Sequence, residues 1–345
     1  MKVGLTGLPG AGKTTVFTAL TGLEAATVER RPQIGTIKVP DARIDRLHEI
    51  HKPKKTTYAE VTFVDFPPAR DAQKRTVLDA EAIAALRDAD ALVEVVRGFP
   101  DLTGAAARPI ADIEAFDTEL ALADLAQVEK RLERMQKEKG HERELPLFER
   151  LKETLEAGTP LRTLGLGALE RATLAGFAFL SLRPLLIVQN VPENEVAAAV
   201  PADLAARAAA AGAEAMVLSA KVEAELAALE PDDRAAFLAD LGLTESARDR
   251  FIHKSYHLLD LVSFLTAGED ECRAWTIRRG TPARQAAGRI HSDIERGFIR
   301  AEVVAFDDFV RLGSEAKCRD AGKLRLEGKD YVVQDGDIIH FRFAV

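Results

Sequence analysis

The amino-acid sequence predicts an α/β fold: a doubly wound, mostly parallel sheet with an inserted helical hairpin and a small C-terminal α+β module. Three observations predict it. Short apolar runs alternate with helical patterns over most of the chain, a charged helical stretch interrupts them, and after Ile252 short β-like runs separated by turn pairs take over. The chain of 345 residues is about twice the usual length of one domain, so we expect more than one.

The strands of the sheet are predicted from short apolar runs followed by turn or helix signals. The first run, residues 1–6, leads into a glycine-rich turn and then into a helical pattern over residues 14–21. Further runs of this kind span residues 59–65, 91–96, 185–190 and 213–218. Because helical stretches separate these runs, we expect the strands to lie mostly parallel in one sheet.

A helical insertion is predicted where the composition shifts to Glu, Leu, Ala, Lys and Arg, between residues 113 and 176. Its apolar residues recur near helical spacing, at Leu120, Leu122, Leu125, Val128, Leu132 and Met135. A strand-like run resumes afterwards, which favours an antiparallel hairpin inside the α/β domain. The two parts of the α/β domain are predicted to span residues 1–112 and 181–260. The insertion between them spans 113–180, and the C-terminal module spans 261–345.

Composition excludes several classes of protein. Hydrophobic residues make up 47% of the chain and charged residues 30%, which argues against a disordered chain. The net charge of −8 gives no overall cationic field, so nucleic-acid binding would need a local patch and sequence-specific DNA binding is not expected. No uncharged apolar stretch reaches the roughly 18 residues of a membrane span. We expect a cytoplasmic protein without a membrane segment.

Residues 7–14, GLPGAGKT, match the phosphate-binding pattern G-x-x-x-x-G-K-[ST]. The motif follows a predicted strand and opens a predicted helix, which is the context of a P-loop. Gly7, Gly10 and Gly12 let backbone N–H groups face a phosphate with no side chain in the way. Lys13 brings a positive charge to the outer phosphates and is the candidate catalytic residue. The other candidate nucleotide-binding residues of this loop are Pro9, Ala11, Thr14 and Thr15.

Two residues are predicted to hold Mg²⁺. Thr14 offers a hydroxyl directly after Lys13, and Asp65 ends the run EVTFVD, where a P-loop sheet places a second acidic residue. In GTPases this aspartate begins the pattern D-x-x-G, but the fourth position here is Pro68. Because proline has no N–H to donate, we expect sensing of a γ-phosphate by this route to weaken.

The purine is expected to contact two further loops. Residues from Asn190 to Glu193 follow a predicted strand, at the position where GTPases carry N-K-x-D. The aspartate of that motif accepts two hydrogen bonds from guanine, and the longer glutamate without the lysine leaves that interaction poorly formed. Guanine specificity is therefore not expected. Ser219 and Ala220 follow the next strand, where the Ala220 backbone is expected to meet the purine.

In these motifs the chain resembles the YchF or Obg-like ATPase family, within the TRAFAC GTPase class. The resemblance covers nearly the whole length and rests on GLPGAGKTT, VPDARIDRL, KPKK, FVD, DIEAFDTELALADL, NVPENE and LSAKVEAEL, and above all on the stretch from FLTAGEDECRAW to DIIHFRF. It implies a P-loop domain, an inserted helical hairpin and a C-terminal TGS module with the ubiquitin-like β-grasp fold. It also implies ATP binding at least as good as GTP binding, slow hydrolysis and association with ribosomes.

The family's binding residues map onto Gly7 to Thr15, Asp65, Asn190, Glu193 and Ala220. Its switch segments match less well. The family's switch I pattern T-I-E-P-N-V-G aligns with residues 29–35 and leaves no threonine in register, so Thr27 or Thr36 would serve only after a shift. A histidine proposed for catalysis has no counterpart, because none lies between His51 and His141. Nucleotide binding is therefore better supported than turnover.

Three functions stay open at this point. The first is a Mg²⁺-dependent, ATP-preferring and slow ATPase that associates with the ribosome or ribosomal RNA. The second is a nucleotide-gated switch with little or no hydrolysis of its own, which Pro68 and the missing histidine favour. The third is a GTP-specific GTPase, which a strong preference for GTP would establish.

Local basic groups are the candidates for contact with RNA. One is the run from Lys52 to Lys55, and another gathers around Trp275 in the C-terminal module, with Arg273, Arg278, Arg279 and Arg284. Arginine and an aromatic plane can contact RNA bases. A role for Trp275 in the core of the module is the favoured alternative.

Overall fold

The computed structural model describes residues 1–23, 33–66, 78, 80–138 and 140–344. The chain folds into two compact units, and each combines segments that are far apart in sequence. The first unit consists of Met1–Ile37 and Thr62–Phe251, and the second of Lys38–Val61 and Ile252–Val345.

The first unit is built on a six-stranded sheet in the order β2-β4-β1-β5-β6-β7. Four neighbouring pairs, β1–β4, β1–β5, β5–β6 and β6–β7, are parallel, so the carboxyl ends of these five strands meet at one edge. The strands are β1 (Lys2–Thr6), β2 (Gln33–Lys38), β4 (Glu60–Asp65), β5 (Ala91–Arg97), β6 (Leu185–Asn190) and β7 (Glu214–Leu218). The predicted α/β fold with a mostly parallel sheet is confirmed.

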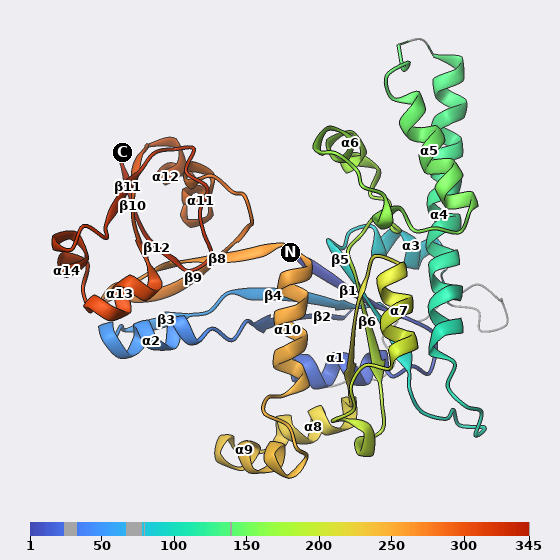
Figure 1. Cartoon of the computed structure of the whole chain (residues 1–345), viewed down its shortest axis with the longest axis horizontal. Helices are drawn as coiled ribbons and strands as arrows, with labels where there is room; N and C mark the ends of the chain where they lie inside the picture. The colour runs from blue at the N-terminus through green and yellow to red at the C-terminus, as the bar shows by residue number, and fades with distance from the viewer. Residues whose placement is uncertain (24–32, 67–77, 79, 139, 345) are drawn as a thin grey trace. The chain divides into compact units, whose positions relative to one another are not determined.

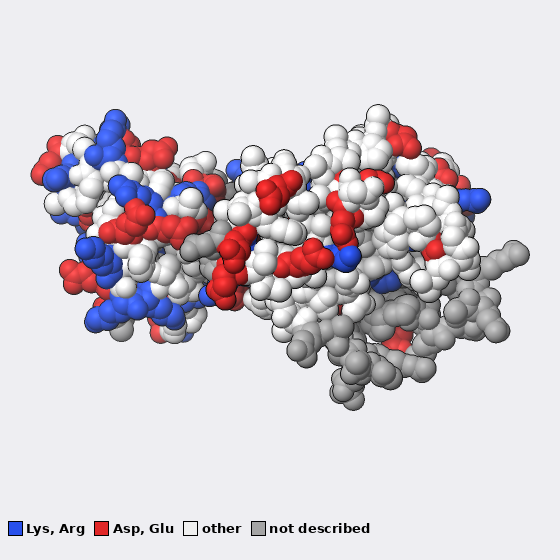
Figure 2. Space-filling model, turned by 90° about the horizontal axis from the view of Figure 1, so that it is seen from below, with Lys and Arg blue, Asp and Glu red and all other residues white. Residues whose placement is uncertain are grey.

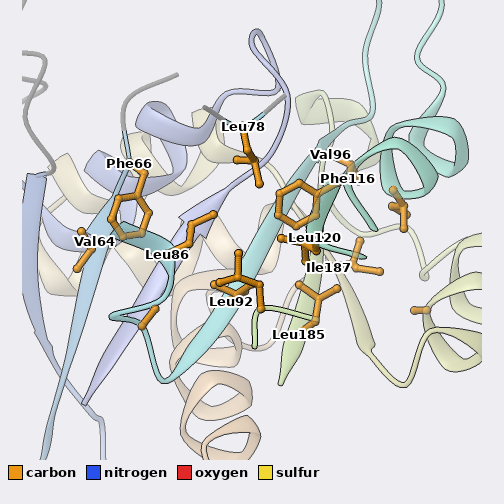
Figure 3. Close-up of a cluster of buried hydrophobic side chains, with 14 of the residues drawn as sticks. Val64, Phe66, Leu78, Leu86, Leu92, Val96, Phe116, Leu120, Leu185 and Ile187 are labelled. Atoms are coloured by element: carbon orange, nitrogen blue, oxygen red, sulfur yellow. The ribbon is translucent and has the colours of Figure 1, made fainter. Parts of the chain in front are cut away.

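Helices cover this sheet and project from it (Figure 1). They are α1 (Lys13–Thr21), α3 (Ala80–Leu86), α4 (Pro109–Lys137), α5 (Leu145–Glu156), α6 (Ala168–Leu174), α7 (Ala202–Ala210), α8 (Ala220–Ala228), α9 (Pro231–Asp240) and α10 (Ala247–Leu258). Three short 3-10 turns join them: η1 (Leu161–Thr163), η2 (Ala175–Phe177) and η3 (Glu193–Glu195). Apolar side chains of β4, β5 and β6 pack with α3 and the first turns of α4 in a buried cluster that includes Phe66, Leu92 and Phe116 (Figure 3). Burial of such a cluster is the main source of the sheet's stability.

The helical insertion is an antiparallel pair formed by the outer part of α4 and by α5. Val128, Leu132 and Met135 of α4 pack against Phe148 and other apolar residues of α5. Of the apolar stripe predicted from the sequence, Leu125, Val128, Leu132 and Met135 thus belong to the cluster that α4 shares with α5, whereas Leu120 packs in the cluster of the sheet and Leu122 is exposed. Helix α4 begins at Pro109, where a proline fits the first helical turn.

Charged side chains are buried where α4 leaves the sheet. Asp117 forms ion pairs with Arg162 (2.5 Å) and Arg207 (2.7 Å). Glu94 of β5 lies beside them, fully buried, and neither of its carboxylate oxygens has a hydrogen-bond partner among the described residues. Burial raises the pKa of Glu94 well above its usual value, and Asp117 and Asp112 raise it further, while the two arginines oppose this. Burial of Glu94 therefore favours the protonated form of its carboxyl group.

The second unit is a six-stranded mixed sheet in the order β11-β10-β12-β8-β9-β3. Its strands are β3 (Lys55–Thr57), β8 (Leu261–Thr266), β9 (Glu271–Arg278), β10 (Phe298–Ala305), β11 (Arg325–Glu327) and β12 (Asp337–Phe343). Its helices are α2 (Ala42–His51), α11 (Ala283–Ile290), α12 (Ser292–Arg296), α13 (Phe306–Leu312) and α14 (Glu315–Asp320). Three alanines of α11 pack against β8, β9, β10 and β12, which allows a close approach of helix and sheet.

The segment Lys38–Val61, between β2 and β4, belongs to the second unit. Its strand β3 pairs in parallel with β9, with Lys55 opposite Glu271, and Arg43 of α2 forms an ion pair with Asp335 (2.9 Å). The predicted boundaries differ here, because they assign all of residues 1–112 to the α/β domain. A three-residue strand without apolar alternation carries no sequence signal for a partner more than two hundred residues away.

Candidate functional site

The glycines of the P-loop adopt conformations that other residues rarely take. Gly7, Gly10 and Gly12 have φ angles of 131°, 82° and 86°. A Cβ atom on Gly7 would lie 2.2 Å from the carbonyl oxygen of Val95, and one on Gly12 would lie 2.3 Å from Nδ2 of Asn190. At Gly7 and Gly12 the close contacts with β5 and β6 therefore favour glycine, whereas at Gly10 only the positive φ angle does.

The loop leads directly into α1, whose N-terminal residue is Lys13. No side chain caps this end of the helix, and Gly12 at the N-cap position has none to offer. The first N–H groups of the helix and its positive dipole end therefore remain available to an anion. Pro9 and Thr15 are exposed at this end of the sheet. The arrangement is that of a phosphate-binding site.

Lys13 is buried and its ammonium bonds to the loop itself. Nζ donates to the carbonyl oxygens of Gly7 (2.7 Å) and Leu8 (3.3 Å). Burial lowers the pKa of Lys13, and the nearby carboxylate of Asp65 acts in the opposite direction. The charged end of Lys13 is thus already held within the loop, where a phosphate would be bound.

Thr14 and Asp65, the two residues predicted to hold Mg²⁺, lie within hydrogen-bond distance of each other. The Thr14 hydroxyl donates to Oδ2 of Asp65 at 2.9 Å. Asp65 is the last residue of β4, where it lies opposite Leu5 of the parallel strand β1. The other carboxylate oxygen, Oδ1, is buried and has no hydrogen-bond partner among the described residues. Burial raises the pKa of Asp65, while Thr14 and Lys13 lower it. A hydroxyl next to an unpartnered buried carboxylate oxygen fits the oxygen ligands that Mg²⁺ prefers.

Asn190 ties the P-loop to the loop after β7. Its Nδ2 donates to the carbonyl oxygen of Ala11 (3.1 Å), and its Oδ1 accepts from the backbone N–H of Ala220 (3.1 Å). Ser219 is fully buried, and its hydroxyl has no partner among the described residues. Three segments that are distant in sequence are therefore joined at one edge of the sheet through a single side chain.

Glu193 lies in the turn η3 after β6, and its carboxylate forms an ion pair with Lys221 at the start of α8. Both side chains are largely exposed, with 46% and 69% of their surface accessible. Lys221 is not among the predicted site residues. Only its position directly after Ala220 could have indicated it, since the two residues that pair are 28 positions apart in sequence.

The switch segments lie partly outside the described residues. Thr27 and Pro68 lie outside the described residues, so the roles predicted for them in sensing the γ-phosphate stay predictions. Thr36 lies on β2. The loop between β5 and α4 is described, and it contains no histidine. Within it Asp101 accepts hydrogen bonds from the Thr103 N–H (2.9 Å), the Thr103 hydroxyl (2.6 Å) and the Ala105 N–H (3.0 Å), which order the turn locally.

The basic group of the second unit is partly integrated into its sheet. The guanidinium of Arg273 lies 4.0 Å from the centre of the Trp275 ring, and the ring stacks on Phe264 in the core. Nε1 of Trp275 donates to the Thr266 hydroxyl at 3.0 Å. Figure 2 shows Lys and Arg side chains of this unit gathered in places beside acidic ones. The tryptophan therefore has a structural role, while one face of Arg273 stays accessible.

Comparison with known proteins gives two family matches and close relatives. A family described as "50S ribosome-binding GTPase" matches residues 2–143, and the YchF-GTPase_C family, described as a protein of unknown function, matches residues 261–344. The chain is 42% identical to the "Ribosome-binding ATPase YchF" of Bacillus subtilis over 366 aligned residues, covering all of both chains. It is 40% identical to the protein of the same name from Escherichia coli O157:H7, covering 100% and 99%.

A solved structure agrees with this. The Schizosaccharomyces pombe YchF GTPase superposes with a TM-score of 0.88 at 29% sequence identity, covering 99% of this chain and 97% of the other. Among the described residues, no helix combines the length and the apolar character needed to cross a membrane.

Proposed function

The chain belongs to the YchF family, and on that premise we propose that it is an ATPase that binds Mg²⁺ and ATP at the carboxyl edge of the first sheet and associates with the ribosome. The observation that carries the proposal is the meeting of four segments at that edge. Thr14 joins the P-loop to Asp65 at the end of β4, and Asn190, at the end of β6, joins it to the start of α8 after β7, while Lys13 is held within the P-loop itself. This combination supplies groups for phosphate, metal and base.

The phosphates are assigned to the P-loop. Backbone N–H groups from Gly7 to Thr15 and the N-terminus of α1 would bind the phosphate oxygens, with Lys13 as the only side-chain cation buried in the loop. Thr14 and Asp65 would hold Mg²⁺, which supplies charge stabilisation to the phosphate oxygens when bound. The ammonium of Lys13 is already held within the loop by the carbonyl oxygens of Gly7 and Leu8.

The base is assigned to Asn190, Glu193, Ser219 and Ala220. We infer a preference for ATP over GTP, because the Ala220 N–H is used by Asn190 and Glu193 is paired with Lys221. The Ala220 N–H is then not free to donate to guanine, and the Lys221 ammonium competes with the donors of guanine for the Glu193 carboxylate. A GTP-specific GTPase is the alternative that a strong preference for GTP would establish.

Hydrolysis is proposed to be slow. The water that attacks the γ-phosphate needs an orienting group, and no histidine is present in the loop between β5 and α4. Lys13 and the metal stabilise the charge of the transition state without orienting that water. A nucleotide-gated switch with little or no hydrolysis of its own is the second candidate, and the same absence favours it.

The ribosome is the proposed partner because the relatives carry ribosome binding in their names. Ribosomal RNA is the finer candidate, with Arg273 and the run from Lys52 to Lys55 as contacts. We also propose that the protein acts in the cytoplasm, where ribosomes and ATP are present.

The test is a titration of the purified chain with fluorescent ATP and GTP analogues, with and without Mg²⁺, together with phosphate release from the same samples. We expect ATP to bind more tightly than GTP, Mg²⁺ to strengthen binding, and phosphate release above a protein-free blank. Lys13→Ala is the control, and it should lose both signals. Binding without release would establish the switch, and tighter binding of GTP would establish the GTPase.

A further inference from the structure

The last strand of the second unit, β12, runs on beyond its neighbour β8. On one side β12 pairs with β10 from Asp337 to Phe343. On the other side, among the described residues, it pairs with β8 only at Ile338, which lies opposite Leu265. Strand β8 ends at Thr266, whereas β12 continues for five residues beyond Ile338. This second edge of β12 therefore has no described strand partner over its C-terminal part, and we refer to it as the free edge.

A cavity of about 320 Å³ lies along the free edge. Its wall includes five of the six residues from Ile338 to Phe343, together with Thr266 and Ala267, where β8 ends. Because successive residues of a strand point to opposite faces, a cavity that touches nearly all of them lies along the edge of the strand and not over one face. The cavity, called the β12 slot below, thus occupies the place that a continuation of β8 would take.

One face of the sheet beside the slot is apolar. Ile339 and Phe341 of β12 belong to the core cluster of the second unit, in which the alanines of α11 also pack. Ile290 at the end of α11 and Ile294 of α12 pack against this cluster and line the slot. Phe343, next along the same face of β12, is 40% exposed. Apolar side chains that enter the slot on this face would therefore lose their contact with water.

The opposite face carries an excess of positive charge. Arg342 of β12 lies directly opposite Arg300 of β10, and both donate to the buried carboxylate of Glu302, at 3.0 Å and 3.3 Å. Arg319 of α14 lies 4.0 Å from the same carboxylate and 3.2 Å from that of Glu315. Three guanidinium groups thus share two carboxylates, and 45–60% of each arginine side chain is accessible.

These arginines retain hydrogen-bonding capacity for a further anion. A guanidinium has five N–H groups, and the contacts with Glu302 and Glu315 use only some of them. Like charges placed directly opposite each other on neighbouring strands repel, and an added carboxylate would relieve that repulsion between Arg300 and Arg342. The charge of this face is therefore complementary to an acidic partner.

We propose that the β12 slot binds an extended peptide segment of a partner protein, which adds a strand to the free edge and alternates apolar with acidic side chains. Main-chain hydrogen bonds to β12 supply affinity, and the two faces select the alternate side chains. The apolar ones meet Ile290 and Ile294, and the acidic ones meet Arg342. A strand edge beside an apolar wall favours a peptide over RNA, whose backbone brings phosphates without apolar side chains. The slot lies wholly within the second unit and goes beyond the proposed function.

The experiment measures the fluorescence anisotropy of a fluorescein-labelled octapeptide that alternates valine with glutamate, titrated with the full chain. We expect saturable binding. A peptide that alternates valine with lysine should bind at least about tenfold more weakly, because it loses the charge-assisted hydrogen bonds. A valine-glutamate peptide with proline at a central valine should also bind at least about tenfold more weakly, since proline has no N–H for strand pairing.

Three variants test the position of the site. Ala267→Trp places a large side chain on the wall of the slot, at a partly exposed turn position, and should abolish binding of the valine-glutamate peptide. Arg342→Gln should weaken that peptide about tenfold and leave the valine-lysine peptide no weaker than before. Arg279→Gln is the matched control: Arg279 is 58% exposed, has one ion pair, with Asp260, and lies outside the slot, so affinity should stay within about twofold. Melting followed by circular dichroism shows whether each variant is folded.

Several results would overturn the proposal. Absence of saturable binding of the valine-glutamate peptide to the wild-type chain is the first. Equal binding of the valine-lysine peptide refutes the charge complementarity, and equal binding of the proline peptide refutes strand addition. An equal loss of affinity in Arg279→Gln and Arg342→Gln shows a general electrostatic attraction in place of a site. If a single-stranded RNA oligonucleotide binds in a way that Ala267→Trp abolishes while the peptide does not bind, the slot is an RNA site and the proposal fails.

Discussion

Replacing Asn190 with alanine tests whether this side chain holds the nucleotide site together. Asn190 is buried, at 5% exposed, and so are the two residues to which it bonds, Ala11 and Ala220 at 2% each. The alanine variant leaves one backbone carbonyl and one backbone N–H without their partner. Each orphaned buried group costs about 1–3 kcal/mol, so we expect a loss of about 2–6 kcal/mol in the free energy of unfolding.

The assay combines urea unfolding, hydrogen exchange at the Ala220 amide and titration with fluorescent ATP. We expect faster exchange at Ala220 and an ATP affinity at least about tenfold weaker, because the end of the P-loop is no longer anchored. Asn190→Asp is the control: its carboxylate still accepts from Ala220 but cannot donate to Ala11, so the Ala220 amide should stay protected. An unfolding free energy within about 0.5 kcal/mol of wild type in the alanine variant, with unchanged exchange at Ala220, would refute the reasoning.

Three further predictions concern the remaining buried groups. Gly7→Ala should abolish ATP binding in the same titration, because its Cβ would lie 2.2 Å from the Val95 carbonyl oxygen. Gly10→Ala, whose Cβ meets open space, should retain ATP binding at a backbone strain of about 1–2 kcal/mol. Equal losses of affinity in the two variants would contradict the argument. Asp117→Ala leaves a buried guanidinium unpaired and should lower the free energy of unfolding in urea by about 3–5 kcal/mol, and a change below about 1 kcal/mol would contradict it. Glu94 has a raised pKa, so the folded protein keeps a proton that the unfolded chain releases. The free energy of unfolding should therefore fall as pH rises from the ordinary carboxyl value of about 4. Glu94→Gln should flatten this pH dependence in melting curves, and an unchanged slope would show that other groups cause it.

The parts that could be predicted from the sequence are those encoded by local patterns. The P-loop is one, because three glycines and a lysine at fixed spacing admit few other structures. The parallel sheet and the hairpin are others, since each strand and each apolar stripe lies within a continuous stretch. The family is confirmed through motifs of this kind along the whole chain.

The parts that could not be predicted depend on contacts between distant residues. Glu94 stands in a strand pattern that gives no sign of a carboxylate buried beside Asp117, which is 23 positions away. The ion pair between Glu193 and Lys221 follows from the parallel pairing of two strands, not from either motif. Strand β3 joins a sheet whose other strands begin at residue 261. Such pairings are decided by tertiary packing.

The placement of residues 38–61 also determines how this protein can be dissected. The backbone passes between the two units three times, after Ile37, after Val61 and after Phe251, so no single cut separates them. Removing residues 261–345 would expose the edge of β3 that pairs with β9, and it would leave Arg43 without Asp335. A truncated chain of this kind is therefore a damaged protein, not an isolated nucleotide-binding domain. Point variants on the intact chain are the sound way to assign tasks to either unit.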